Sequence, residues 1–426
     1  MNPRETSRLS RVLVFAEHFP PFLGSDRTVF ELSSRLADRG IRVHYVTTQP
    51  LRYLLGARPP DWSYKENWTK GPPKIHRLIS AEYLLVGPRV ERLWRRFVPL
   101  AYLLTVVLFI MRSLWTAAHF KPDVMIGVHA TPIVGLVAAA TSRMTMCPLL
   151  MGCPDWMTAY AAGLKSSSIS SIGPVFLQKI ETALYRVSDR VFASTHFLKR
   201  LLVSHGVRGS RITVIPNGVD TTIFHPEVDT SAVREKYRLH DTCVVLFAGH
   251  LEIWAGLSLI IDLAQRLDHE GMRATILLVG TGDYVSDLFA KLVKQNLGHM
   301  VIHAGLQPYS SMPAFVAASD IALCIFPDTP LSHAASPLKL FEYMGGGKAI
   351  VATRVAGTQE VVDDTHAVLV PPRSISAVCD AVVRLCGDPR LRTELGSRAR
   401  ALAIERHDWN HLSHLFMREC ERVLRH

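Results

Sequence analysis

The chain has 426 residues, of which 48% are hydrophobic and 20% are charged, so a disordered or fibrous protein is excluded and two domains of roughly 200 residues each are predicted. Its formal net charge of +11 favours anionic partners such as phosphates or a lipid surface. Nucleic acid is excluded as a partner because the basic residues do not alternate with aromatic residues as in a module that reads DNA or RNA.

The start of the chain and its cysteines indicate a cytoplasmic protein. The first eleven residues are polar and no apolar run precedes the first strand, so we expect no signal peptide. The seven cysteines include no CxxC pair and have no metal-ligand spacing to histidines. This pattern predicts reduced and mostly buried thiols.

Short apolar runs rich in β-branched residues alternate with longer amphipathic stretches, as is typical of parallel strands joined by crossover helices. The expected strands of the first half are 11–16, 42–47, 74–78, 124–128, 148–151 and 190–193. Those of the second half are 244–248, 275–279, 301–303, 321–325, 349–352 and 367–370. Two such series predict an α/β protein with two doubly wound parallel sheets, whose ligands bind beyond the carboxyl ends of the strands.

The two predicted domains meet near 211–226, where residues 214–220 (VIPNGVD) are typical of a strand that runs into a turn. We therefore expect a first domain at 1–212 and a second at 213–405. A periodic stretch at about 410–424 predicts a final helix within 406–426.

One apolar segment has two open interpretations. Residues 97–110 carry no charge, and arginines surround them at positions 89, 92, 95, 96 and 112. A helix of this length covers about 21 Å, less than the ~30 Å hydrocarbon core, so we do not expect it to span a membrane. It is either an interfacial helix whose arginines meet anionic headgroups, so that 89–112 contacts a membrane, or a buried helix of the first domain.

The segment 336–348 (SPLKLFEYMGGGK) predicts an anion site at a helix start. We expect Ser336 to be the N-cap and Pro337 the first helical residue. The amides of Leu338 and Lys339 then lack intrahelical acceptors, and with the helix dipole they favour a diphosphate. Glu342 lies on the same face and can accept both hydroxyls of a ribose. The alternative is an ordinary capped surface helix.

Three turns of small residues follow predicted strands. The first contains Gly24 and Ser25 and is followed by Arg27. The others are Gly249-His250 and the 280–282 turn, with Gly280 and Gly282. Such turns let the backbone approach a phosphate closely. We expect them to face one another across a cleft between the domains.

Taken together, these motifs resemble retaining glycosyltransferase family 4, of the two-domain GT-B architecture, over nearly the whole chain. Residues 214–220 are similar to the start of the family's second domain. Residues 278–282 are similar to the glycine turn of that domain, and residues 336–347 to its donor-binding helix. Residues 122–129 and 155–156 are similar to the subgroup that builds bacterial surface polysaccharides.

The resemblance implies transfer of a sugar from a nucleotide-sugar donor without a bound metal or other cofactor. Glu342 would hold the ribose, and the amides of Leu338 and Lys339, together with the Gly24 turn, would hold the diphosphate. His129 would meet the transferring sugar or the acceptor, unless it is a structural histidine near the core. The final helix would pack back on the first domain. The basic, apolar segment suggests a glycolipid or polyprenyl-linked acceptor at the inner face of the cytoplasmic membrane.

The chain departs from the family pattern at four positions. Members usually have an arginine, a lysine, an acid and a glycine where this chain has His250, Ala255, Ala334 and Ser25. The two lost cations normally neutralise the leaving diphosphate. Lys339, Arg27 and protonated His250 are the expected replacements. Two alternatives stay open: a catalytically silent binding or assembly subunit, and a nucleotide-sugar epimerase.

Overall fold

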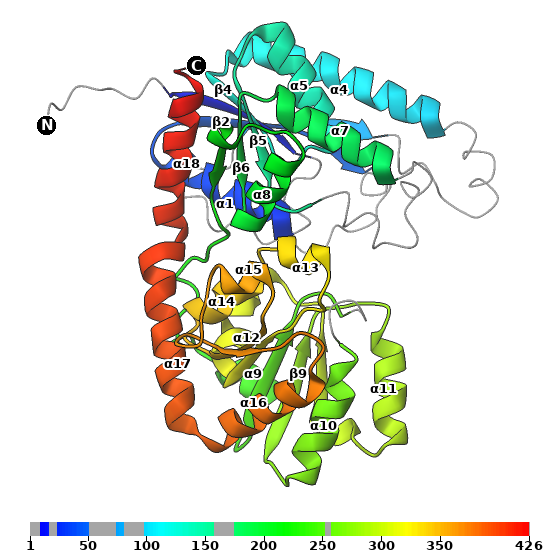
Figure 1. The fold of residues 1–426 in the computed structure, drawn as a ribbon, viewed down its shortest axis with the longest axis vertical. Helices are drawn as coiled ribbons and strands as arrows, with labels where there is room; N and C mark the ends of the chain where they lie inside the picture. Colours follow the sequence, from blue (N-terminus) through cyan, green and yellow to red (C-terminus); the bar gives the residue numbers. More distant parts are fainter. Residues whose placement is uncertain are drawn as a thin grey trace, which may run out of the picture. The chain divides into compact units, whose positions relative to one another are not determined.

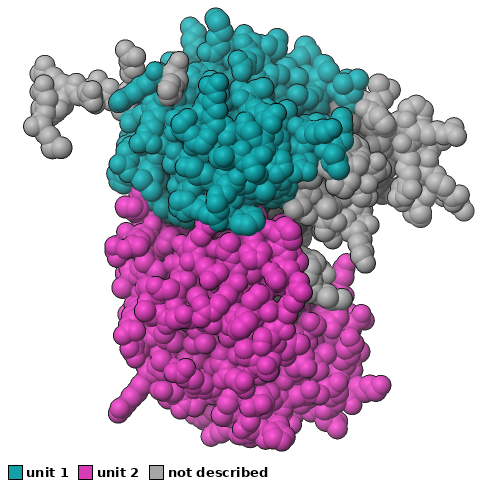
Figure 2. All heavy atoms as spheres, viewed as in Figure 1, with its two compact units in different colours: residues 1–216, 412–426 teal, residues 217–411 magenta. Residues whose placement is uncertain are grey.

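The computed structural model describes residues 9–16, 24–50, 74–80, 98–156, 174–251 and 257–425. The chain divides into two compact units (Figure 2). Unit 1 contains residues 1–216 and 412–426, and unit 2 contains residues 217–411. The first boundary lies four residues after the expected one because residues 212–214 form the last strand of the unit 1 sheet.

Figure 1 shows the sheet of unit 1 and the helices around it. This parallel sheet has seven strands in the order β3-β2-β1-β4-β5-β6-β7. Its strands are β1 Arg11–Ala16, β2 Arg42–Pro50, β3 Lys74–Ser80, β4 Val124–Gly127, β5 Leu149–Cys153, β6 Arg190–Ala193 and β7 Ile212–Val214. Its helices are α1 Gly24–Asp38, α4 Val98–Phe120, α5 Val134–Thr145, α7 Pro174–Val187 and α8 His196–Ser204.

Unit 2 has a six-stranded parallel sheet in the order β10-β9-β8-β11-β12-β13. Its strands are β8 Cys243–Ala248, β9 Ala274–Val279, β10 Val301–Gly305, β11 Ile321–Cys324, β12 Ala349–Thr353 and β13 Val368–Val370. Its helices are α9 Ser231–Lys236, α10 Leu259–His269, α11 Val285–Lys294, α12 Met312–Ala318, α13 Pro330–Ala334, α14 Leu338–Gly345, α15 Ala356–Gln359, α16 Ile375–Gly387 and α17 Pro389–Leu402. The prediction of two doubly wound parallel sheets is confirmed.

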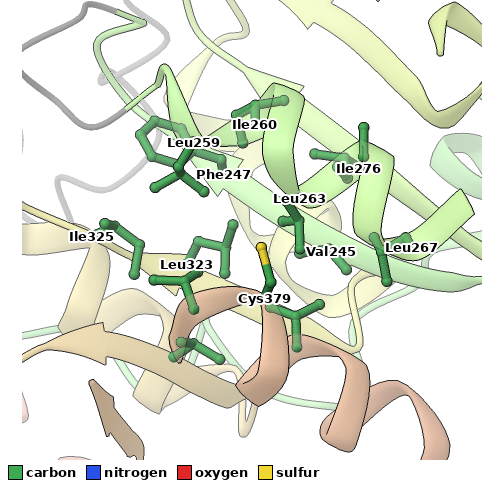
Figure 3. Packing of buried hydrophobic residues seen from close by; sticks show 14 of the residues in the cluster. Val245, Phe247, Leu259, Ile260, Leu263, Leu267, Ile276, Leu323, Ile325 and Cys379 are labelled. Carbon is green, nitrogen blue, oxygen red and sulfur yellow. The ribbon is translucent and has the colours of Figure 1, made fainter. Parts of the chain in front are cut away.

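Successive side chains along the strands of unit 2 point to opposite faces of the sheet, and a hydrophobic core lies on each face. Val245 and Phe247 of β8 pack with α10 and with Cys379 of α16 (Figure 3). Val244, Leu246 and Ala248 belong to the other cluster, which includes α14 residues. Successive side chains of a strand point to opposite faces, so a continuous apolar run is what a sheet covered on both sides requires.

The chain ends in helix α18 (Trp409–Val423), preceded by a π-helical turn at Ala403–His407. Within unit 1, the ring of Phe416 lies 5.4 Å from that of Phe192 in β6, edge to face. Arg190 of the same strand donates to Glu419 at 2.8 Å in a buried ion pair. The later part of α18 is therefore part of unit 1, whereas Trp409 belongs to unit 2.

Helix α4 has 23 residues and is longer than the expected 97–110 segment because Arg112 and His119 interrupt its apolar composition without ending the helix. In the part of the chain that the structure describes, it is the one helix long and apolar enough to cross a membrane, by length and composition alone. Phe109, Ala117 and Phe120 are buried, as in a core helix. The opposite face is exposed and apolar and consists of Leu103, Leu104, Val107, Leu108, Met111 and Trp115.

Candidate functional site

Three glycines lie at or just beyond the carboxyl ends of the adjacent strands β8, β9 and β10. Gly249, Gly280 and Gly305 have left-handed φ values of 125°, 136° and 74°. Gly249 donates its backbone N–H to Val279 at 2.9 Å, and Gly280 donates to Gly305 at 2.9 Å. These hydrogen bonds link the ends of the three strands, and the three glycines line the carboxyl-terminal edge of the unit 2 sheet; we call this row the glycine rim. Ligands of parallel sheets bind at this edge.

Gly280 tolerates no side chain at this rim. A β-carbon there would lie 1.9 Å from the carbonyl oxygen of Gly249. Gly280→Ala is therefore expected to destabilise unit 2 by about 3 kcal/mol or more, since it combines a steric clash with an unfavourable φ. A thermal melt measures the loss.

Gly271 provides the matched control for this prediction. It has a φ of 61°, and a β-carbon there would meet nothing within 4 Å. Gly271→Ala is expected to cost only about 1–2 kcal/mol, the cost of a left-handed conformation in alanine. Equal losses in the two variants would contradict the close approach of Gly280 to Gly249.

Helix α14 begins one residue later than expected. Pro337 is its N-cap, with φ −73° and ψ 117°, and no side chain caps the helix. The prediction that Ser336 is the N-cap is wrong because its Oγ instead accepts the backbone N–H of Asn217 at 3.4 Å. The Ser336 carbonyl accepts a hydrogen bond from the Asn217 side-chain amide. The first amides of the helix still belong to Leu338 and Lys339.

Asn217 is a residue of the site that the sequence reasoning missed. The 214–220 motif indicated a domain boundary, whereas Asn217 is buried and fastens the segment before α14 with two hydrogen bonds. An asparagine can donate from its amide and from its backbone at once, which explains the residue type. The sequence signal that could have identified Asn217 is its position in the 214–220 motif, which is similar to a motif of the family.

Lys339 lies directly at the glycine rim. Its Nζ is 4.4 Å from the centroid of the Phe247 ring and 5.2 Å from that of Phe326. It is also 3.6 Å from the position of a β-carbon built on Gly249. Burial lowers the pKa of Lys339, and Cys324 and Glu342 oppose that shift. Among the described residues no carboxylate oxygen lies within 4.0 Å of this ammonium.

The rest of α14 is anchored in unit 2. Tyr343 accepts the backbone N–H of Ala248 at 3.0 Å, and burial raises the pKa of Tyr343 well above its usual value. Leu340, Phe341 and Met344 are fully buried in the core. Because the apolar face is fixed in this way, Lys339 and Glu342 are held on a rigid element rather than on a loop. Glu342 is 8% exposed.

The other unit 2 candidates occupy the same edge of the sheet. His250 is exposed and directly follows Gly249. Gly282 is half-buried and lies between β9 and α11. Ala334, at the position of the family's first acid, is buried at the end of α13. Ala255 lies outside the described residues. The structure therefore brings Gly249, Gly280 and Lys339 together and places His250 beside them.

The unit 1 candidates differ partly from expectation. Gly24 and Ser25 form the first residues of helix α1, so the prediction that they lie in a loop is wrong. Arg27 is buried and donates to Glu31 at 2.6 Å, and Glu31 also binds Arg35 at 2.6 Å. The charge of Arg27 is thus already paired. His129 is 3% exposed and follows β4 at its carboxyl end.

Known proteins resemble the chain over most of its length. Residues 23–223 match the model of Glycosyltransferase Family 4, and residues 242–388 match that of Glycosyl transferases group 1. A D-inositol 3-phosphate glycosyltransferase of Acidothermus cellulolyticus is 31% identical over 239 residues, 53% of this chain; the chain spans about half of that relative, 52%. A GDP-mannose-dependent alpha-(1-6)-phosphatidylinositol monomannoside mannosyltransferase of Mycobacterium tuberculosis is 22% identical, with 95% of this chain and 96% of that protein covered.

Solved structures share the fold. Anabaena Alr3699/HepE in complex with UDP-glucose superposes with a TM-score of 0.71 at 18% identity, covering 95% of this chain and 97% of that one. WaaG, a glycosyltransferase involved in lipopolysaccharide biosynthesis, superposes with a TM-score of 0.64 at 14% identity, covering 96% and 98%. The predicted GT-B fold is therefore confirmed.

Proposed function

Because the chain belongs to glycosyltransferase family 4, we propose that it transfers a sugar from a nucleotide-sugar donor to an acceptor, without a bound metal. The observation that carries this proposal is the position of Lys339. Its ammonium lies at the glycine rim, beside the first turn of α14 and without a carboxylate partner among the described residues. A helix start combined with a lysine is a suitable site for a diphosphate.

We propose the following mechanism for this site. The bond between the anomeric carbon and the diphosphate oxygen breaks, and the leaving nucleotide takes the electron pair. A hydroxyl oxygen of the acceptor forms the new bond to the anomeric carbon, and its proton passes to the leaving diphosphate. The amides of Leu338 and Lys339 and the Lys339 ammonium stabilise the new negative charge, with protonated His250 as a further cation. Glu342, in the second turn of the helix, binds the ribose. In unit 1, His129 contacts the sugar or the acceptor, and the family implies retention of configuration.

We further propose a lipid-linked acceptor at the inner face of the cytoplasmic membrane. The exposed apolar face of α4 supports this proposal, since a helix with one apolar face can lie in the interfacial region of a bilayer. The mycobacterial relative has a phosphatidylinositol mannoside in its name. Arg89, Arg92, Arg95 and Arg96 lie outside the described residues.

Ligand-induced stabilisation tests the donor site. Nucleoside diphosphates and nucleotide sugars of each base are added separately, and the melting temperature is measured. A ligand present at 100 times its Kd is expected to stabilise the protein by about 2.7 kcal/mol. If no nucleotide shifts the melting temperature, the assignment of the α14 site is wrong.

Product analysis with donor alone, and then with donor and a lipid acceptor, separates the three functions that the sequence leaves open. A transferase hydrolyses the donor slowly at most, and consumes it when a lipid acceptor is supplied. An epimerase converts the sugar without an acceptor. A silent subunit binds the nucleotide sugar and leaves it unchanged with every acceptor.

Vesicle flotation tests the α4 face. Leu104 and Met111 are 53% and 62% exposed, so Leu104→Glu with Met111→Glu is expected to abolish flotation with anionic vesicles without unfolding unit 1. Val293→Glu is the matched control, since Val293 is 67% exposed but lies on α11 of unit 2. Equal flotation of both variants would rule out docking through α4.

A further inference from the structure

Polar side chains join the loops that follow β11, β12 and β13 in unit 2. His333 lies in α13, between β11 and α14, and its Nε2 is 2.9 Å from Oδ1 of Asp328. Its Nδ1 accepts the backbone N–H of Ala356, the first residue of α15, at 3.0 Å. Arg373, beyond β13, donates to the Asp328 carbonyl oxygen at 3.3 Å. Because the strands are parallel, these loops share the carboxyl-terminal edge of the sheet with the glycine rim.

The loop that contains α13 leads directly into α14. Helix α13 packs against α15 (Figure 1). A β-carbon on Gly357 of α15 would overlap the carbonyl oxygen of Ala335, so the two segments are in close contact. Ser336 is hydrogen-bonded to Asn217, and α14 begins two residues after Ser336. The position of the first turn of α14 therefore depends on the contacts of the loop before it.

The two hydrogen bonds of His333 determine its protonation state. The Asp328 carboxylate can only accept, so Nε2 carries a proton, and the Ala356 N–H can only donate, so Nδ1 carries none. The imidazole is therefore neutral. A second proton would occupy Nδ1 and abolish the hydrogen bond to Ala356. The hydrogen bond from His333 lowers the pKa of Asp328, and Arg373 adds to this effect against the cost of burial, so this acceptor keeps its charge at mildly acidic pH.

The charged groups around His333 keep their charge near neutral pH. Arg373 forms an ion pair with the Asp328 carboxylate at 3.8 Å. Arg354, between β12 and α15, donates to both carboxylate oxygens of Asp364, at 2.7 and 2.9 Å. Glu360 is exposed and lies at the end of α15 that is opposite to Ala356. Histidine is the residue type that titrates between about pH 5 and 8, so its proton uptake is the change that can alter the contact between these loops.

We propose that His333 is a positioning residue of the donor site, whose neutral imidazole holds the loop before α14 against α15 and releases it on protonation. This proposal rests on the proposed function, since α14 is the helix that would bind the diphosphate. The contact is fully present above the titration range of His333 and is lost as the pH falls through it. Diphosphate binding should therefore be stronger with the neutral imidazole than with the protonated one.

Two substitutions separate the hydrogen bonds of His333. The amide oxygen of asparagine can take the place of Nδ1, so His333→Asn keeps the acceptor for Ala356 at every pH. The longer glutamine can reach Asp328 with its amide group, so His333→Gln keeps that contact and loses the one to Ala356. His366→Gln is the matched control, because His366 also lies 2.7 Å from an aspartate, Asp363, but in the segment between α15 and β13.

Hydrogen–deuterium exchange of the peptide that contains Ala356 tests the contact without any ligand. Protection is measured at about pH 8 and about pH 5.5 and corrected for the effect of pH on unprotected amides. In the native protein and in His366→Gln, it is expected to be about 3–10-fold lower at the acidic pH, the effect of one lost hydrogen bond. His333→Asn should be equally protected at both pH values, and His333→Gln equally unprotected. The same pH dependence in the native protein and in His333→Asn would overturn the proposal.

Calorimetric titration with inorganic pyrophosphate tests the effect on the donor site. At about pH 8, His333→Gln is expected to bind pyrophosphate about 3–10-fold more weakly than the native protein, whereas His333→Asn and His366→Gln bind it equally well. At about pH 5.5 the native protein and His333→Gln should no longer differ. Proteins are compared at one pH, so the titration of pyrophosphate and of Lys339 cancels. Equal losses in His333→Asn and His333→Gln at both pH values would show a purely structural role and overturn the proposal.

The two measurements distinguish this proposal from the proposed function. If exchange responds as expected but the native protein binds no pyrophosphate, the assignment of the α14 site is wrong and the positioning role fails with it. If the native protein binds pyrophosphate but its exchange does not depend on pH, His333 is not a positioning residue and the α14 site stands. Circular dichroism confirms that each variant is folded, and the exchange of the native protein at the two pH values decides the proposal if one is not.

Discussion

Replacing Lys339 with methionine is expected to lower kcat for sugar transfer by about 10²–10³-fold, the range found when one group that stabilises developing charge is removed. Methionine keeps the length and the apolar contacts with Phe247 and Phe326 but removes the ammonium beside Gly249. Because charge on the diphosphate grows as the glycosidic bond breaks, kcat should fall more than the donor KM rises. Steady-state kinetics with the donor concentration varied up to saturation measures both.

Lys348 offers the matched control. It lies three residues after the end of α14, and its Nζ donates to the carbonyl oxygen of Ala317 at 2.7 Å, so its role is structural. Burial lowers the pKa of Lys348 to about 8. Lys348→Met is expected to lower the melting temperature and leave kcat unchanged. An unchanged kcat in Lys339→Met, or an equal loss in both variants, would show that Lys339 does not act on the leaving group.

The sheets could be predicted from the sequence because their signal is local. Buried parallel strands are continuous apolar runs, and Arg11–Ala16 and Arg190–Ala193 have the predicted bounds. The end of α4 could not be predicted, since Arg112 is tolerated in a helix with an exposed face. The length of a helix depends on the residues that pack against it, and the number of apolar residues in the segment does not give this information.

The part of the candidate site that lies on a single helix could be predicted from the sequence. Lys339 and Glu342 share α14, so their spacing follows from helical geometry. Contacts between distant segments were not predictable. The Ser336 hydroxyl accepts a hydrogen bond from Asn217 and does not cap α14, and the Arg27 guanidinium forms an ion pair with Glu31. Each of these contacts depends on the position of a partner residue, which a local sequence pattern does not give.

Glu342→Ala is expected to weaken binding of a nucleoside diphosphate about 10–100-fold, because two hydrogen bonds from the ribose hydroxyls to a charged acceptor are lost. Isothermal titration measures the affinity. The same experiment with the 2′-deoxynucleotide shows the origin of the loss. The native protein should bind the deoxy form more weakly than the ribose form, and the variant should no longer distinguish them.

Inorganic pyrophosphate separates a ribose contact from a structural role for Glu342. The Glu342 charge acts on Lys339 and raises its pKa, so the two groups share one electrostatic environment. A carboxylate repels a diphosphate; its removal should therefore leave pyrophosphate binding unchanged or stronger, provided that the experiment is run where Lys339 is protonated. If Glu342 binds the ribose, the variant thus binds a nucleotide more weakly but does not bind pyrophosphate more weakly. If both bind more weakly, Glu342 supports the fold of the site instead, because a carboxylate 8% exposed leaves a cavity when it is removed.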